Sequence, residues 1–213
     1  MTPKQNYQKI LDSELEKIKQ SGNTPTLLLH SCCAPCSSYV LEYLTEYFNI
    51  ILYYYNPNIS PKEEYEKRKA EQIRLISSMK TENKVDFLDC DYDYNDFENI
   101  ARGYEKCKEG GERCFRCYEL RLRKTAVEAK KNGFDYFCTT LSISPLKNSQ
   151  KINEIGFFLE NEIGVKWLPS DFKKKEGYKR SIELSKEYNL YRQNFCGCVY
   201  IKNQLNSKEN DNE

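Results

Sequence analysis

Seven of the ten cysteines in this chain fall into three short groups, a spacing typical of a metal-binding protein. Thiolates gathered in this way are soft ligands, which select zinc, copper(I) or iron–sulfur clusters. The groups are Cys32, Cys33 and Cys36, then Cys114 and Cys117, and finally Cys196 and Cys198. Because one tetrahedral ion needs only four ligands, seven thiolates indicate a cluster together with a second metal.

Two other interpretations of the same cysteines remain open at this point. Four of the thiolates would be enough to close a structural zinc site, which is tetrahedral. The pair Cys33 and Cys36 also has the C-x-x-C spacing of a thioredoxin-type redox motif. Against pure dithiol chemistry, Pro35 directly precedes Cys36, and the other two groups would have no role.

The sequence around the second and third groups favours ionised thiols aimed at one point. Cys114 and Cys117 are three residues apart, so a helix that begins near them presents both thiols on one face. The positive end of such a helix lowers thiol pKa values. Nearby basic residues are Arg113, Arg116 and Arg121. In the third group, Gly197 permits a backbone turn that aims both neighbouring thiols inward.

The other candidate ligands are isolated in the sequence. His30, the only histidine, lies two residues before Cys32 and is either a core residue or a ligand or proton donor. Cys90, Cys107 and Cys138 have no partner at ligand spacing. We therefore expect these three cysteines to be dispensable for metal binding.

Alternating strands and helices must position the cysteine groups. Apolar runs predict strands at residues 26–30, 49–55, 85–89, 134–140 and 165–168. Amphipathic patterns predict helices at residues 61–79, 113–131, 148–162 and 175–187. This alternation is typical of an α/β protein with a parallel sheet flanked by helices. Since function in such sheets gathers at the carboxyl ends of the strands, Cys32, Asn56 and Thr139 should meet at one edge.

Length and composition predict one domain. We expect a single α/β catalytic domain over residues 25–202, with an N-terminal helical extension over residues 1–24 and a disordered polar tail over residues 203–213. The N-terminus is too polar for a signal peptide, and no apolar run approaches the roughly 20 residues of a membrane span. A cytoplasmic location is the expectation, and ten cysteines there favour metal or catalysis over disulfides.

Charge is balanced overall but locally uneven. The net charge of +1 creates no global basic field. Residues 102–131, however, hold ten basic and five acidic residues, and residues 166–192 hold eight and four. These segments suit a phosphate-bearing substrate, although on charge alone ordinary solvated helix faces are the favoured interpretation. The tyrosines that would stack on a base or fill the core are Tyr53, Tyr54, Tyr55 and Tyr191.

Six separated motifs, in this order, resemble the cobalamin-independent epoxyqueuosine reductases, the QueH family. They are residues 30–36 (HSCCAPC), 55–59 (YNPNI), 113–118 (RCFRCY), 139–145 (TTLSISP), 171–178 (DFKKKEGY) and 191–198 (YRQNFCGC). The resemblance covers roughly residues 25–200. It implies an α/β sheet of the nucleotide-hydrolase-like (HUP-like) kind, with the cysteine-bearing C-terminal segment closing the metal site.

The resemblance also implies the reaction and its cofactors. Epoxyqueuosine at the wobble position of a tRNA anticodon is reduced to queuosine, the last step of queuosine synthesis. The family uses a [4Fe–4S] cluster and an adjacent mononuclear iron, and an unidentified electron donor must supply the electrons. Some relatives have aspartate where this chain has Cys36, which suits an oxygen- or sulfur-ligated single iron there.

On this basis the candidate residues divide by role. Cluster ligands are Cys33, Cys114, Cys117 and Cys198, and ligands of the single iron are Cys32, Cys36 and Cys196. Candidate proton donors are His30 and Tyr118. Candidate contacts to the phosphates of tRNA are Lys173, Lys174, Arg180 and Arg192. The alternative is a zinc-stabilised RNA-binding module without catalysis. A tRNA thiolation enzyme that uses ATP is disfavoured, because the sequence contains no glycine-rich phosphate-binding loop.

Overall fold

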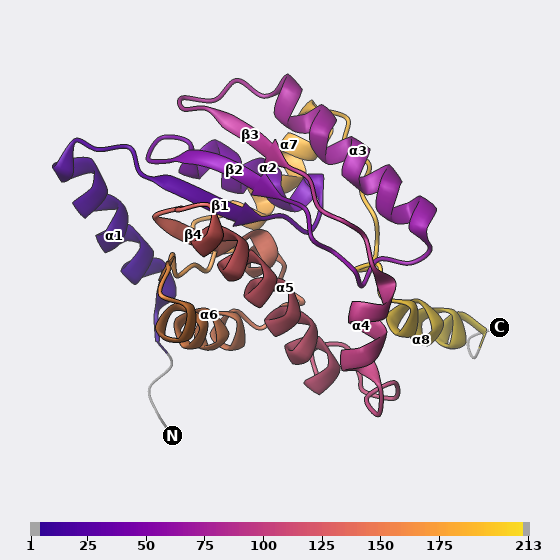
Figure 1. The fold of residues 1–213 in the computed structure, drawn as a ribbon. Helices are drawn as coiled ribbons and strands as arrows, with labels where there is room; N and C mark the ends of the chain where they lie inside the picture. Colours follow the sequence, from indigo (N-terminus) through magenta and orange to yellow (C-terminus); the bar gives the residue numbers. More distant parts are fainter. Residues whose placement is uncertain (1–4, 211–213) are drawn as a thin grey trace.

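The computed structural model describes residues 5–210, with side chains described through residue 204, and a five-stranded parallel sheet forms the centre of that part of the chain (Figure 1). The strands are β1 (Thr26–His30), β2 (Asn49–Tyr53), β3 (Val85–Leu88), β4 (Tyr136–Thr139) and β5 (Lys166–Trp167). Strands β1 and β4 are almost entirely buried, as in a sheet covered on both faces. The predicted parallel α/β fold is confirmed.

The strand order, β3-β2-β1-β4-β5, determines where a ligand can bind. The chain builds β1, β2 and β3 in one direction and then crosses back to place β4 on the other side of β1. His30, the last residue of β1, is level with Tyr53 of β2 and Thr139 of β4. In α/β sheets, ligands bind at the carboxyl ends of the strands beside such a reversal. The first cysteine group follows His30 and therefore lies at this point.

Helices cover both faces of the sheet. They are α1 (Tyr7–Ser21), α2 (Ala34–Leu44), α3 (Lys62–Ser78), α4 (Tyr94–Ala101), α5 (Glu112–Lys131), the short 3-10 turn η1 (Thr140–Ile143), α6 (Ser149–Ile163), α7 (Gly177–Glu187) and α8 (Val199–Asn210). Helices α2 and α3 lie on one face, with α7 packed against α2, whereas α5 and α6 pack together on the other face (Figure 1). Crossovers between parallel strands are right-handed. Because the direction of strand addition changes after β3, the helices before and after β3 therefore cover opposite faces of the sheet.

Helix α1 is packed into the domain. Its apolar face, formed by Leu11, Leu15 and Ile18, is buried in the same core as the sheet. On its polar side, Glu14 accepts a hydrogen bond of 2.7 Å from the hydroxyl of Tyr136 in β4. The predicted helix is present, but it adds a layer to the domain instead of extending from it. Residues 1–4 of the predicted extension lie outside the described residues.

The C-terminal segment is helical where a disordered tail is predicted from residue 203. Helix α8 continues to Asn210, and residues 211–213 lie outside the described residues. The helix is anchored at its start by Ile201, which is buried against Phe97, Cys117 and Cys198. The predicted disorder rested on the polar composition of the residues after Ile201, and composition does not reveal the buried contacts of Ile201 itself. Among the described residues, no helix combines the length and apolarity needed to cross a membrane.

Candidate metal centre

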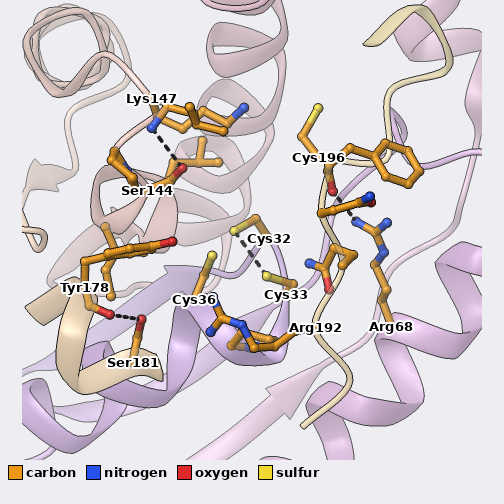
Figure 2. A pocket seen from close by; sticks show the side chains of 18 of the residues that line it. Cys32, Cys33, Cys36, Arg68, Ser144, Lys147, Tyr178, Ser181, Arg192 and Cys196 are labelled. Atoms are coloured by element: carbon orange, nitrogen blue, oxygen red, sulfur yellow. Dashed lines mark hydrogen bonds between the residues drawn. The ribbon is translucent and has the colours of Figure 1, made fainter. Parts of the chain in front are cut away.

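The first cysteine group sits in the turn from β1 into α2. Cys33 is the N-cap residue of α2, and Pro35 lies in its first turn, where a missing N–H costs nothing. The sulfurs of Cys32, Cys33 and Cys36 all lie within 4.8 Å of one another (Figure 2). Within the described residues, this is the one group of three or more side chains close enough to share a metal ion. Three soft donors at this spacing fit a thiophilic metal.

The second and third cysteine groups lie beside each other. Cys117 and Cys198 belong to one small buried cluster, and Cys196 packs against it. Ionisation of Cys196 raises the pKa values of both Cys114 and Cys117, which burial already raises. The seven cysteines therefore form a set of three and a neighbouring set of four.

The turn after β2 holds these segments together. The Nδ2 of Asn56 donates to the carbonyl of Ser31 at 2.8 Å, and the Nδ2 of Asn58 donates to the carbonyl of Cys196 at 3.1 Å. The backbone N–H of Ser60 donates to the carbonyl of Gly197 at 3.0 Å. One asparagine thus fixes the first cysteine group and the other fixes the third. The turn at residues 56–58 therefore has a specific positioning role.

A cavity of about 330 Å³ opens between the cysteine groups. Cys32, Cys33, Cys36 and Cys196 line it, so the first and third cysteine groups both contribute thiols to its wall. Figure 2 shows Tyr178 from α7 on the side of the cavity away from Cys196, with Arg192 extending beneath Cys36. Thiol, aromatic and basic side chains therefore share the lining of this cavity, to which Phe195, Arg121 and Lys147 also belong.

Each set of cysteines contains one thiol that ionises easily. Hydrogen bonds from Cys33 and Cys36 hold the pKa of Cys32 well below its usual range, and the hydroxyl of Thr140 adds a further bond of 3.4 Å. The shared proton raises the pKa of Cys33 to about 12. A hydrogen bond from Cys198, with help from the charge of Lys147, lowers the pKa of Cys196 to about 5. Each set thus offers a thiolate to an incoming metal.

Buried cations surround the thiols, and sequence reasoning recognised them only in part. Arg113 and Arg121 lie on the same helix as the second cysteine group and are almost fully buried. Lys147 forms a buried ion pair of 2.9 Å with Glu109. Burial alone would lower the pKa of Lys147, but the negative charges of Cys196 and Glu109 raise it above its usual value. The sequence indicated the arginines because they lie close to Cys114 and Cys117 on the same predicted helix. Lys147 lies in a loop whose sequence contains no such signal.

The two predicted proton donors differ in their surroundings. His30 is completely buried and both ring nitrogens have partners, the hydroxyl of Thr139 at 2.8 Å and the carbonyl of Tyr55 at 3.1 Å. Burial lowers the pKa of His30 to about 3, so the ring is neutral. Tyr118 has a buried hydroxyl without a hydrogen-bond partner, and burial raises its pKa, which keeps the proton in place.

The four residues predicted to contact phosphates differ in whether their charge is already paired. Arg180 is held by Glu42 at 2.6 Å, and Lys173 pairs with Asp171 at the same distance. Lys174 is exposed, and Arg192 lines the cavity, where it donates to the hydroxyl of Ser185.

The remaining tyrosine and cysteine candidates differ in their position relative to the cavity. Tyr53, Tyr54 and Tyr55 are buried in the core, so they are not exposed for stacking. Tyr191 hydrogen-bonds to Glu64 on α3. Sequence reasoning missed Tyr178, the tyrosine that lines the cavity. Cys90, Cys107 and Cys138 lie outside the cavity lining, and their dispensability stays a prediction.

The fold and the site together define an α/β protein with a group of three cysteines suited to metal binding at the carboxyl ends of its strands. The family model of the epoxyqueuosine reductase QueH matches residues 27–204. The chain therefore belongs to the QueH epoxyqueuosine reductase family.

Individual relatives agree with this assignment. The epoxyqueuosine reductase QueH of Streptococcus pyogenes serotype M1 is 46% identical over 204 residues, which cover 94% of this chain and 80% of the relative. That of Staphylococcus epidermidis is 45% identical over 199 residues, covering 92% and 84%. The more distant one of Thermotoga maritima is 38% identical over 184 residues, covering 82% and 89%.

Proposed function

We propose that the cavity beside the three cysteine groups is the centre at which this chain converts epoxyqueuosine to queuosine in tRNA, the reaction of its family. As a family member the chain is an oxidoreductase that acts on tRNA. The observation that carries the proposal for the site is the convergence of all three cysteine groups beside one cavity at the strand reversal. A soft-donor set of this size suits iron–sulfur chemistry.

The spatial arrangement supports a division of the ligands that differs from the sequence-based one. The set of four, Cys114, Cys117, Cys196 and Cys198, matches the four thiolates of a [4Fe–4S] cluster. The set of three, Cys32, Cys33 and Cys36, is left for the single iron. Cys33 and Cys196 thereby exchange places relative to the sequence-based assignment. When bound, the cluster would relay two electrons from the reductant, one at a time, and the single iron would act as a Lewis acid on the epoxide oxygen.

The chain itself has to bind the modified base and exclude bulk water. Tyr178 and Arg192 stand on the cavity wall away from Cys196, where an aromatic ring and a guanidinium suit a splayed-out base and its phosphate. Lys173 and Arg180 form ion pairs with carboxylates, whereas Lys174 and Arg192 form none among the described residues. We therefore rank Lys174 and Arg192 as the stronger candidates for contacts to tRNA.

Removing the epoxide oxygen as water takes two electrons and two protons, and leaves a carbon–carbon double bond. Tyr118 is our candidate for one proton, because its buried hydroxyl is protonated and free to donate. His30 is better suited to positioning than to proton transfer, because both ring nitrogens are engaged between β2 and β4. The electrons come from a reductant that is not yet identified.

The fold supports two further parts of the proposal. The order β3-β2-β1-β4-β5 is that of a doubly wound nucleotide-binding sheet, which agrees with the HUP-like fold. Residues 192–196 of the C-terminal segment line the cavity, which supports the expectation that this segment closes the metal site. A cytoplasmic location is consistent with a tRNA substrate.

The decisive experiment uses protein purified without oxygen. Iron and acid-labile sulfide are counted per chain, and the reduced protein is then given tRNA that carries epoxyqueuosine. Nucleoside mass analysis should show queuosine. The metal count should give more iron per chain than the four ions of one cluster. A colourless protein that contains zinc, binds the tRNA and forms no queuosine would establish the zinc-stabilised binding module instead.

A further inference from the structure

Arg121 is a buried cation that is not paired with a carboxylate among the described residues. It lies on α5 and is 3% exposed, yet none of the ion pairs in the described part of the chain includes it. Its Nε donates to the carbonyl of Cys117 at 3.2 Å, and its Nη1 lies 3.4 Å from the Oδ1 of Asn56. By contrast, Arg123, two residues further along the same helix, pairs with Glu119 and Glu162 at the surface.

A buried charge of this kind must be balanced, because moving an unpaired ion out of water costs several kcal/mol. Carbonyl and amide oxygens orient the guanidinium of Arg121 but carry no net charge. The negative groups that face it are the thiols of Cys117, Cys32 and Cys196, which raise its pKa when they ionise. These thiols come from three separate segments, so Arg121 stands between the two cysteine sets.

Arg121 also lines the cavity together with Cys32 and Cys196. The side chain therefore occupies the space between the proposed cluster and the proposed single iron. An oxidised [4Fe–4S] group with four thiolates has a net double negative charge, and ferrous iron with three thiolates has a single one. One fixed positive charge between them reduces the mutual repulsion of the two groups. It also favours the arrival of each further electron.

We propose that Arg121 is the positioning residue that balances the charge of both thiolate–metal groups and so sets their reduction potential. The inference rests on the proposed cofactors and assigns a role within the same centre. Asn56 orients the guanidinium from the turn after β2, and the carbonyl of Cys117 orients it from α5. The residue acts through the metal groups and takes no direct part in proton transfer.

The test compares the reconstituted holoprotein with variants that remove or keep the charge. Arg121→Gln removes the charge but keeps a donor for Asn56, Arg121→Met is a second charge-free variant, and Arg121→Lys keeps the charge. Arg123→Gln, on the exposed side of the same helix, is the matched control. Iron and sulfide are counted in each, and the midpoint potential is followed by a redox titration monitored by electron paramagnetic resonance.

We expect both charge-free variants to shift the midpoint potential to more negative values, or to lose metal, whereas Arg121→Lys and Arg123→Gln keep the content and potential of the starting protein. If either charge-free variant is fully loaded with an unchanged potential, the proposal is wrong. It is equally wrong if Arg121→Lys loses as much metal as Arg121→Gln, because shape would then matter and charge would not. A starting protein without iron would refute the proposed function itself.

Discussion

Replacing Gly197 by alanine should displace the third cysteine group while the rest of the fold stays intact. Gly197 lies between Cys196 and Cys198 and has a φ of +94°, in the left-handed region. A Cβ at this position would come within 2.8 Å of the side chain of Ile59 and 3.1 Å of its Cα. Ile59 is buried, so neither its side chain nor its backbone has room to move away.

The magnitudes decide which part of the structure yields. The left-handed conformation costs an alanine about 1–2 kcal/mol, and overpacking a dense region adds about 1–3 kcal/mol. Residues 196 and 197 themselves are held by two hydrogen bonds, from Asn58 to Cys196 and from Ser60 to Gly197, which together contribute only about 1–3 kcal/mol. The buried Ile201 anchors the chain beyond them. Because the strain of about 2–5 kcal/mol is similar to or larger than the contribution of these bonds, we expect residues 196 and 197 to shift before the sheet unfolds.

The assay is the iron and sulfide content of Gly197→Ala, together with its far-ultraviolet circular dichroism. We expect native secondary structure and a large loss of sulfide and iron. Gly133→Ala is the matched control, since Gly133 also has a positive φ, of +71°, but nothing lies within 4 Å of its virtual Cβ. That variant should lose only about 1–2 kcal/mol of stability and keep its metal. Wild-type metal content in Gly197→Ala would refute the reasoning.

Four further outcomes test other parts of the site. Tyr178→Ala should raise KM for tRNA roughly 5- to 150-fold, the equivalent of about 1–3 kcal/mol of stacking, with an unchanged metal spectrum, and a KM like that of the starting protein would exclude stacking. Arg192→Gln should weaken tRNA binding and reduce its salt dependence; Arg180→Gln should not, because Glu42 already neutralises that charge, and equal losses would contradict this ranking. In metal-free protein, alkylation of Cys196 should slow as the pH falls through about 5, because the depressed pKa keeps the thiolate present above that value; mass spectrometry that finds the midpoint near 8.5 would disprove the shift. Cys138→Ala should lower thermal stability, because this thiol is fully buried, yet leave iron intact, and loss of iron would show that the cysteines are wrongly grouped.

Much of the site was predictable because its chemistry is local in the sequence. Each cysteine group is a short motif beside a predicted strand end or helix start, and the geometry of parallel sheets brings such ends to one edge. The predicted parallel sheet is confirmed, as is its position next to the first group. Helix ends were predicted to within a few residues, since apolar periodicity defines the buried face better than the ends.

The rest depended on contacts between distant segments, which no local pattern records. The pairing of Lys147 with Glu109 joins residues 38 positions apart, and nothing in either loop predicts it. The placement of Tyr178 in the cavity depends on how α7 packs against α2. Likewise, the helical residues after position 202 follow from the burial of Ile201, a contact with α4 and α5 that composition does not reveal.

The position of the third cysteine group near the end of the chain has a consequence in time. Cys36 and Cys196 are 160 residues apart, and ribosomes add about 5–20 residues per second. The first three thiols are thus synthesised on the order of ten seconds or more before the last two. Throughout that interval Cys32, the readily ionised thiol of its set, has no C-terminal segment over it and is open to any thiophilic ion in the cell. A metal group that is held by all three cysteine groups can therefore be completed only after synthesis, and a thiophilic ion that binds the first group during translation would compete with it.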